Sequence, residues 1–203
     1  LKETPDGMVI TEFLPKVPWA GKHNTISCAA GHHFREGRWL HDSRFLDDYA
    51  RFWFRGGGEP RKYSFWAADS LFQYFMLTGD PRLMADLYPD LVKNYEAWRD
   101  HLVEKDGRPF LYWQTDGADG GEVSNGGGGM RPTINSYQYG DAKALAAFAA
   151  LFPASERAGM ADRFERDAER IRTEMLKTLW NSEQHFFEVM PELGKPLSGV
   201  RES

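Results

Sequence analysis

The densest group of side chains able to do chemistry lies in one glycine-rich run, residues 114–132. It holds three carboxylates, Asp116, Asp119 and Glu122, spaced three residues apart among seven glycines. A run of this length without regular structure is typical of a functional loop or a disordered connector. A connector has no need of spaced carboxylates, and glycine lets the backbone approach a bound ligand closely. The pattern therefore favours a functional loop.

Three kinds of site use loops of this composition. A phosphate-binding loop is excluded, because the glycine spacing is wrong and no Lys-Ser or Lys-Thr pair follows. An EF-hand calcium loop is disfavoured, because its alternating ligand positions are missing. Carboxylate acid–base chemistry remains. Hydrolysis of a glycosidic bond, for example, needs one carboxylic acid to protonate the leaving oxygen and a second carboxylate to activate water or to attack.

Asp119 and Glu122 are too close in the sequence to flank a sugar from opposite faces. We therefore expect each to tune the acidity of the other, as neighbouring carboxylates do. The second reacting carboxylate is expected elsewhere.

Aromatic and polar residues around the loop are the candidates for holding a sugar. The rings of Trp113 and Tyr137 offer flat apolar faces on which pyranose rings stack. Asp116, Arg131 and Asn135 are candidates for hydrogen bonds to hydroxyl or acid groups. For Arg131, an ion pair with a loop carboxylate is the alternative.

Earlier in the chain, Trp66 and Asp69 are further candidates for substrate binding, although Asp69 fits equally well as a core carboxylate with satisfied hydrogen bonds. A metal site at His32 and His33 is disfavoured, because adjacent histidines point in different directions on a helix. Structural hydrogen bonding or a proton shuttle remains open for them. No metal and no cofactor are expected.

Hydrophobic periodicity predicts the helices that position these residues. The predicted helices span residues 26–40, 43–54, 63–77, 80–102, 136–152 and 155–179. Asp80 is the expected N-cap of the fourth helix, which Pro89 should kink or divide, and Ser155 is the expected cap of the sixth. Short strand-like runs are predicted at residues 110–113 and 185–190.

These predictions describe an all-α fold in which mostly apolar helices alternate with amphipathic, charged ones. Helices in two concentric layers, an (α/α) toroid of hairpins, would produce this alternation, and a plain helical bundle is the alternative. Residues 1–24 are expected to form an extended lead-in, and residues 25–203 the helical hairpin domain.

The composition excludes two classes of partner. The formal net charge of −5 and the scattered Lys and Arg residues exclude a phosphate-tracking, nucleic-acid-binding protein. No apolar run approaches the ~20 residues needed to span a bilayer, so no membrane partner is expected. The only cysteine, Cys28, excludes an internal disulfide. Both ends read as cuts from a longer protein, and the cellular location stays open between cytoplasmic and periplasmic or secreted.

Several motifs together resemble the six-hairpin (α/α)6-barrel glycoside hydrolases, in particular the trehalase, family 63 and mannosylglycerate-hydrolase-like group. They are GHHFREGRWLHDSRFLDDYARFWF, YSFWAADS, LTGDPRLMADLYPDLVKNYEAW, the acidic loop, RPTINSYQYGDAKALA and LWNSEQHFF. The resemblance extends from about Pro18 to the end. It implies a carbohydrate substrate and about half of a six-hairpin barrel in this chain.

In that group the general acid is the aspartate of a Glu-Ser-Gly-x-Asp-x-Ser signature. Gly120, Glu122 and Ser124 match its last part, with glutamate replacing aspartate, and Ala118 and Asp119 replace the leading Glu-Ser. A competing alignment makes Asp119 the acid; we favour Glu122 because Ser124 then matches as well. The departure argues against trehalase itself.

The catalytic base of the group lies in the second half of the barrel, so the resemblance implies that the remaining half is a partner of this chain. The favoured function is an inverting, exo-acting glycosidase. A sugar epimerase or isomerase that uses histidines, and a non-catalytic carbohydrate-binding module, are the alternatives.

Overall fold

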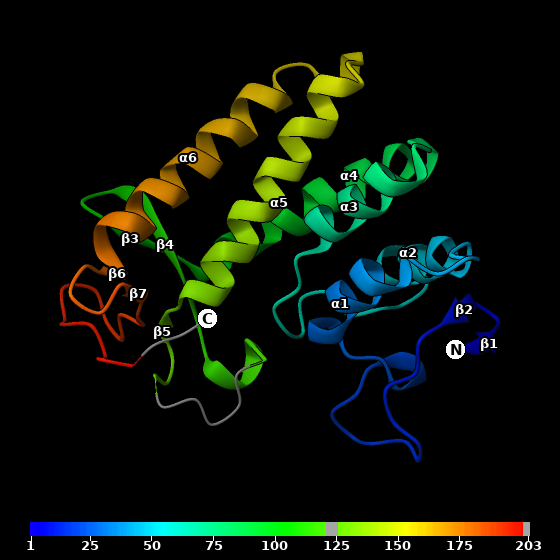
Figure 1. Ribbon diagram of the computed structural model, residues 1–203, viewed down its shortest axis with the longest axis horizontal. Helices are drawn as coiled ribbons and strands as arrows, with labels where there is room; N and C mark the ends of the chain where they lie inside the picture. The colour runs from blue at the N-terminus through cyan, green and yellow to red at the C-terminus, as the bar shows by residue number, and fades with distance from the viewer. Residues whose placement is uncertain (121–125, 201–203) are drawn as a thin grey trace. The chain divides into compact units, whose positions relative to one another are not determined.

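Helices dominate the computed structural model, which describes residues 1–120 and 126–200 and is about 52% helical. Backbone contacts divide the chain into two units, Leu1–Asn94 and Tyr95–Ser203, and each is described by itself. In the first unit lie β1 (Lys2–Thr4), β2 (Gly7–Val9), α1 (Ser27–Gly37), α2 (Phe45–Arg55), α3 (Ala67–Thr78) and most of α4 (Arg82–Ala97). In the second lie β3 (Leu102–Lys105), β4 (Arg108–Gln114), β5 (Gly129–Met130), α5 (Pro132–Leu151), α6 (Met160–Thr178), β6 (Trp180–Asn181) and β7 (Phe186–Phe187) (Figure 1).

The first 24 residues, expected as an extended lead-in, contain a small antiparallel hairpin of β1 and β2 and a 3-10 turn at Lys22–Asn24. The hairpin is tied to α2, because the backbone N–H of Met8 donates a hydrogen bond to Oδ2 of Asp48 at 3.2 Å. This segment is therefore attached to the helices.

The core of the first unit is aromatic. Phe34 of α1, Tyr49 and Trp53 of α2, and Phe65 before α3 are buried and lie in ring contact with one another. Helices α1 and α3 pack closely, and Gly31 permits it: a Cβ atom there would lie 2.4 Å from the Trp66 ring. Glycine is thus required at this crossing.

Helix α3 begins four residues later than predicted. The side chain of Ser27 accepts a hydrogen bond from the N–H of Tyr63 and donates one to its carbonyl, which holds this segment outside the helix. The helix ends at Thr78, within one residue of the predicted end, and is followed by Gly79, whose φ of 68° is a left-handed conformation that favours glycine.

Helix α4 begins as predicted behind Asp80, whose Oδ1 accepts a hydrogen bond from the N–H of Arg82 at 3.0 Å. It continues through Pro89 as one helix, so the chain is not divided there. Proline removes one N–H donor from the ladder, and the helix tolerates that loss.

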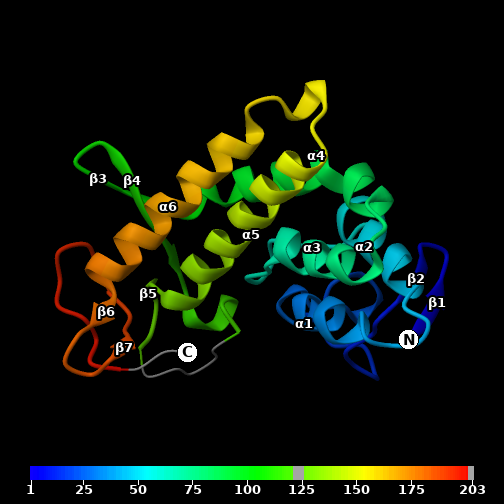
Figure 2. The same cartoon turned by 45° about the horizontal axis from the view of Figure 1, so that its top comes forward.

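The second unit is built on the antiparallel pair α5 and α6, which run side by side in both views (Figures 1 and 2). Helix α5 starts at Pro132, four residues before the predicted start, because proline suits the first helical position. The predicted cap at Ser155 is wrong. Ser155 lies in a separate 3-10 turn, and Gly159, with φ of 72°, precedes α6.

A three-stranded antiparallel sheet, ordered β3-β4-β5, accompanies the helices. The strand predicted at residues 110–113 lies within β4. The sequence does not predict β3, because Leu102 continues the spacing of apolar residues in the preceding helix. Asp106 and Gly107, both at positive φ, form the tight turn between the two strands. The strand-like run predicted at 185–190 contains β7, which pairs with the unpredicted strand β6.

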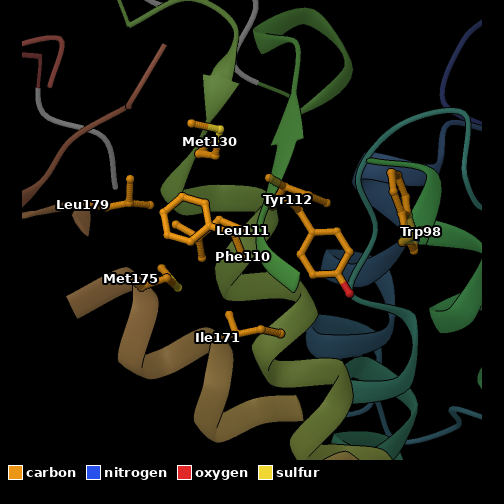
Figure 3. Packing of buried hydrophobic residues seen from close by; sticks show 9 residues of the cluster. Trp98, Phe110, Leu111, Tyr112, Met130, Ile171, Met175 and Leu179 are labelled. Atoms are coloured by element: carbon orange, nitrogen blue, oxygen red, sulfur yellow. The ribbon is translucent and has the colours of Figure 1, made fainter. Parts of the chain in front are cut away.

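The sheet and the helix pair enclose one hydrophobic cluster (Figure 3). Its buried members are Trp98, Phe110, Leu111, Tyr112, Met130, Ile134, Ile171, Met175 and Leu179. Strands β4 and β5 contribute residues to this core, so the chain is held in place on both sides of the acidic loop.

Residues 1–120 and 126–200 are therefore mainly helical, with three small sheets of which the sequence predicted only two strand-like runs.

Candidate functional site

The acidic loop starts with a tight turn directly after β4. Residues Asp116–Ala118 form a 3-10 turn, and the N–H of Asp119 donates to the carbonyls of Thr115 and Asp116, each at 3.1 Å. Oδ1 of the half-buried Asp116 accepts the N–H of Gly117 at 2.7 Å. These local bonds give the first carboxylates of the loop a defined backbone.

Asp119 and Arg131 form a buried ion pair at the base of the loop. Nε of Arg131 lies 3.0 Å from Oδ2 of Asp119, and the two side chains are 1% and 0% exposed. The same guanidinium donates through Nη1 to the carbonyl of Gly127. Arg131 thus links Asp119, which precedes the segment 121–125, to Gly127, which follows it.

Because both side chains are buried against each other, Asp119 is suited to holding Arg131 and has no surface with which to reach a substrate.

Asn135 fixes the first turn of α5 against β4. Its Oδ1 accepts the N–H of Tyr112 at 2.8 Å, and its Nδ2 donates to the carbonyls of Tyr112 and Arg131, both at 2.8 Å. The side chain is fully buried. These bonds use both ends of the carboxamide, so Asn135 supports the backbone on either side of the loop.

Trp113 is the exposed aromatic residue beside the loop. Its side chain points away from the core and is 41% exposed, and its backbone pairs with Met130 of β5. A Cβ atom on Gly128 would lie 3.1 Å from the indole, so glycine lets the returning strand pass close to the ring. His101, which sequence reasoning missed, lies with Nδ1 3.1 Å from the Trp113 carbonyl.

Tyr137 and Glu122 are the remaining residues of the second unit that the sequence predicts for the site. Tyr137 lies half-buried in the first half of α5. Glu122 and the motif residue Ser124 fall in the segment 121–125, outside the residues that the structure describes.

Trp66 and Asp69 belong to the first unit. Trp66 is 6% exposed, and the ring of His32 meets it edge-on at a centroid distance of 4.7 Å. Asp69 is half-buried, accepts a 3.4 Å hydrogen bond from Gln73 and lies 3.9 Å from Nη1 of Arg35. The structure thus places an amide and a guanidinium beside Asp69.

His33, the histidine considered as a proton shuttle, has a partner at each ring nitrogen. Nε2 lies 2.9 Å from Oε1 of Glu12, and Nδ1 lies 3.0 Å from the hydroxyl of Tyr49. Burial raises the pKa of Tyr49 far above its ordinary value, so its hydroxyl stays protonated. The arrangement ties the N-terminal segment to α1 and α2.

Within residues 1–120 and 126–200, no three His, Cys, Asp or Glu side chains gather closely enough to hold a metal ion. None of the helices in these ranges is long and apolar enough to cross a bilayer.

Comparison with known proteins places the chain in a family. No curated protein matches it. It is similar to a solved protein named Sialidase, with 41% sequence identity and a TM-score of 0.88; the match covers 99% of this chain and 19% of that protein. The chain thus spans about a fifth of the length of that structure. The family model of the mannosylglycerate hydrolase MGH1-like glycoside hydrolase domain matches residues 22–203, in agreement with the predicted resemblance, and the chain belongs to this family.

Proposed function

We propose that this chain supplies the acid-bearing part of an inverting, exo-acting glycosidase site, with Glu122 as the general acid. The observation that carries the proposal is the buried pair of Asp119 and Arg131 at the base of the acidic loop. Together with membership of a glycoside hydrolase family, it supports a loop built to hold a carboxylate in place.

The two candidate acids have different requirements. A general acid must be protonated before the reaction, which a raised pKa supplies. The Asp119 side chain is 0% exposed and is paired with Arg131, so it faces the protein and not a substrate. We therefore assign Asp119 to positioning and leave proton donation to Glu122, in keeping with the alignment that also matches Ser124.

Substrate contacts are proposed for the groups that keep exposed surface. Trp113 offers a ring face for stacking, and Asp116 and Tyr137 offer polar atoms for sugar hydroxyls. In the first unit, the half-buried Asp69 is proposed as a separate contact for a sugar hydroxyl, whereas Trp66 is buried and offers little surface to a substrate. The buried Arg131 and Asn135 hold the loop and are proposed to act on the sugar only through it.

The second carboxylate is proposed to come from the rest of the barrel. An apolar groove of about 340 Å³ on the second unit supports this, because it offers a surface for another helix. It is lined by Ser136, Tyr139, Arg172, Met175, Leu176 and Phe187. Leu176 is 45% exposed there. Leu176→Glu should destabilise the full-length protein in thermal melts and leave the isolated 203-residue chain almost unchanged; equal effects on both would contradict this assignment.

Glu122→Gln in the full-length protein tests the assignment of the acid. Loss of general acid catalysis should lower turnover of an oligosaccharide with a poor leaving group by about 10²–10⁴-fold. Near-normal turnover would rule out Glu122.

The epimerase alternative depends on a histidine free to exchange protons with substrate. Both ring nitrogens of His33 face protein partners, which disfavours this role. Loss of activity in His33→Ala, with full activity in Glu122→Gln, would nevertheless reverse the order of the two proposals. Oligosaccharide binding without hydrolysis by the full-length protein would support the non-catalytic module.

A further inference from the structure

The loop that precedes α1 presents an aromatic surface that the proposed site does not use. Trp19 is 52% exposed, and the ring of Phe13 meets it at 75° with a centroid distance of 6.0 Å. An edge-to-face pair of this kind covers at most one face of the indole. About half of the Trp19 surface therefore remains open to solvent.

A buried asparagine holds this loop in shape. Asn24 is 7% exposed; its Nδ2 donates to the carbonyl of Phe13, and its Oδ1 accepts the N–H of Val17 at 3.3 Å. Its own carbonyl accepts the N–H of Glu12 at 3.0 Å. The φ of Asn24 is 58°, a left-handed conformation that asparagine tolerates better than most residues. One residue thus organises both sides of the loop.

A tight turn sets the direction of Trp19. The N–H of Ala20 donates to the carbonyl of Val17 at 3.4 Å, which closes a four-residue turn with Pro18 in its second position. Proline at this position fixes φ before the turn forms. Trp19 is therefore displayed on a preorganised backbone, so little entropy is lost when a ligand covers it.

Resting on the proposed glycosidase function, we propose that Trp19, supported by Phe13, is a binding subsite on which a pyranose ring of an oligosaccharide stacks. The faces of a pyranose carry C–H groups, which suit a flat aromatic surface and gain from leaving water with it. Leu14, which follows Phe13 in the sequence, is 87% exposed on the same loop.

Trp39 provides a matched control. It is 66% exposed, but the guanidinium of Arg38 lies over its ring at 5.1 Å from the centroid, so a cation occupies one of its faces. It lies just beyond the C-terminal end of α1, whereas Trp19 precedes the helix. A general effect of removing a surface tryptophan should appear in both variants.

The experiment is calorimetric titration of the 203-residue chain with maltotetraose, cellotetraose and mannotetraose. For the oligosaccharide that binds, Trp19→Ala should weaken binding about tenfold, since a stacking face is lost. Trp19→Phe should retain most of the affinity, and Trp39→Ala should bind like wild type. Circular dichroism of each variant checks that the fold is intact.

Equal affinity of wild type and Trp19→Ala would overturn the subsite and leave the proposed hydrolysis standing, because hydrolysis is tested separately at Glu122. Failure of all three oligosaccharides to bind the wild-type chain would also overturn it. A change in sedimentation on Trp19→Ala, with unchanged sugar binding, would assign the surface to protein contact instead.

Discussion

Removal of the Asp119 carboxylate should destabilise the second unit strongly. In Asp119→Ala the guanidinium of Arg131 stays buried, at 1% exposure, without the carboxylate that faces it at 3.0 Å. Breaking a buried ion pair from one side costs about 3–5 kcal/mol of unfolding free energy. With a urea m-value of about 1–3 kcal/mol per molar, the unfolding midpoint should fall by about 1 M or more.

The matched control is the surface pair of Lys143 and Glu165 in the same unit, with a shortest distance of 2.7 Å and exposures of 45% and 55%. Glu165→Ala should change the unfolding free energy by less than about 1 kcal/mol, because exposed pairs are well solvated. Urea unfolding followed by tryptophan fluorescence measures both variants.

The double variant Asp119→Leu with Arg131→Met should recover most of the lost stability, since no buried charge is then left without its partner. If Asp119→Ala costs no more than Glu165→Ala, the buried pair does not stabilise the base of the loop and the reasoning fails.

Two further perturbations test the supports of the fold. Asn135→Ala leaves the backbone N–H and C=O of Tyr112 without their side-chain partner. The free energy of unfolding in urea should therefore fall by about 2–4 kcal/mol. A decrease below about 1 kcal/mol would show that water replaces the amide. The hydrogen bond from the Arg82 side chain lowers the pKa of Asp80 to about 2, below its ordinary 3.8. Because the folded-state pKa of Asp80 is depressed, the ionised carboxylate stabilises the folded protein above pH 3.8, and this stabilisation is lost as the pH falls toward 2. Asp80→Asn should therefore lower the melting temperature at pH 5 and have little effect at pH 2; an equal effect at both values would contradict the charge interaction with Arg82.

Much of the helical framework could be predicted from the sequence, because periodicity and capping residues act locally. Helix α3 ends within one residue of its predicted end, and Asp80 precedes α4 as expected. The failures came where a distant contact overrides the local pattern. Ser27 holds Tyr63 outside α3, although the sequence around Tyr63 is apolar and helix-like.

The candidate site likewise combines features that the sequence predicts with features that it does not. The spacing of the loop carboxylates and the candidacy of Arg131 were visible in the sequence. The link from Arg131 to the Gly127 carbonyl was not, because a backbone acceptor leaves no signature in residue types. The three hydrogen bonds of Asn135 depend on β4 lying beside α5, which periodicity does not reveal.

The most direct test of the central claim compares leaving groups in the full-length protein. Glu122→Gln should lose about 10²–10⁴-fold in turnover on an oligosaccharide but far less on an activated aryl glycoside, whose leaving group needs little protonation. Asp119→Asn, which disturbs positioning, should reduce turnover of both substrates by similar factors. Equal losses on both substrates in Glu122→Gln, or a leaving-group dependence seen only in Asp119→Asn, would contradict the account.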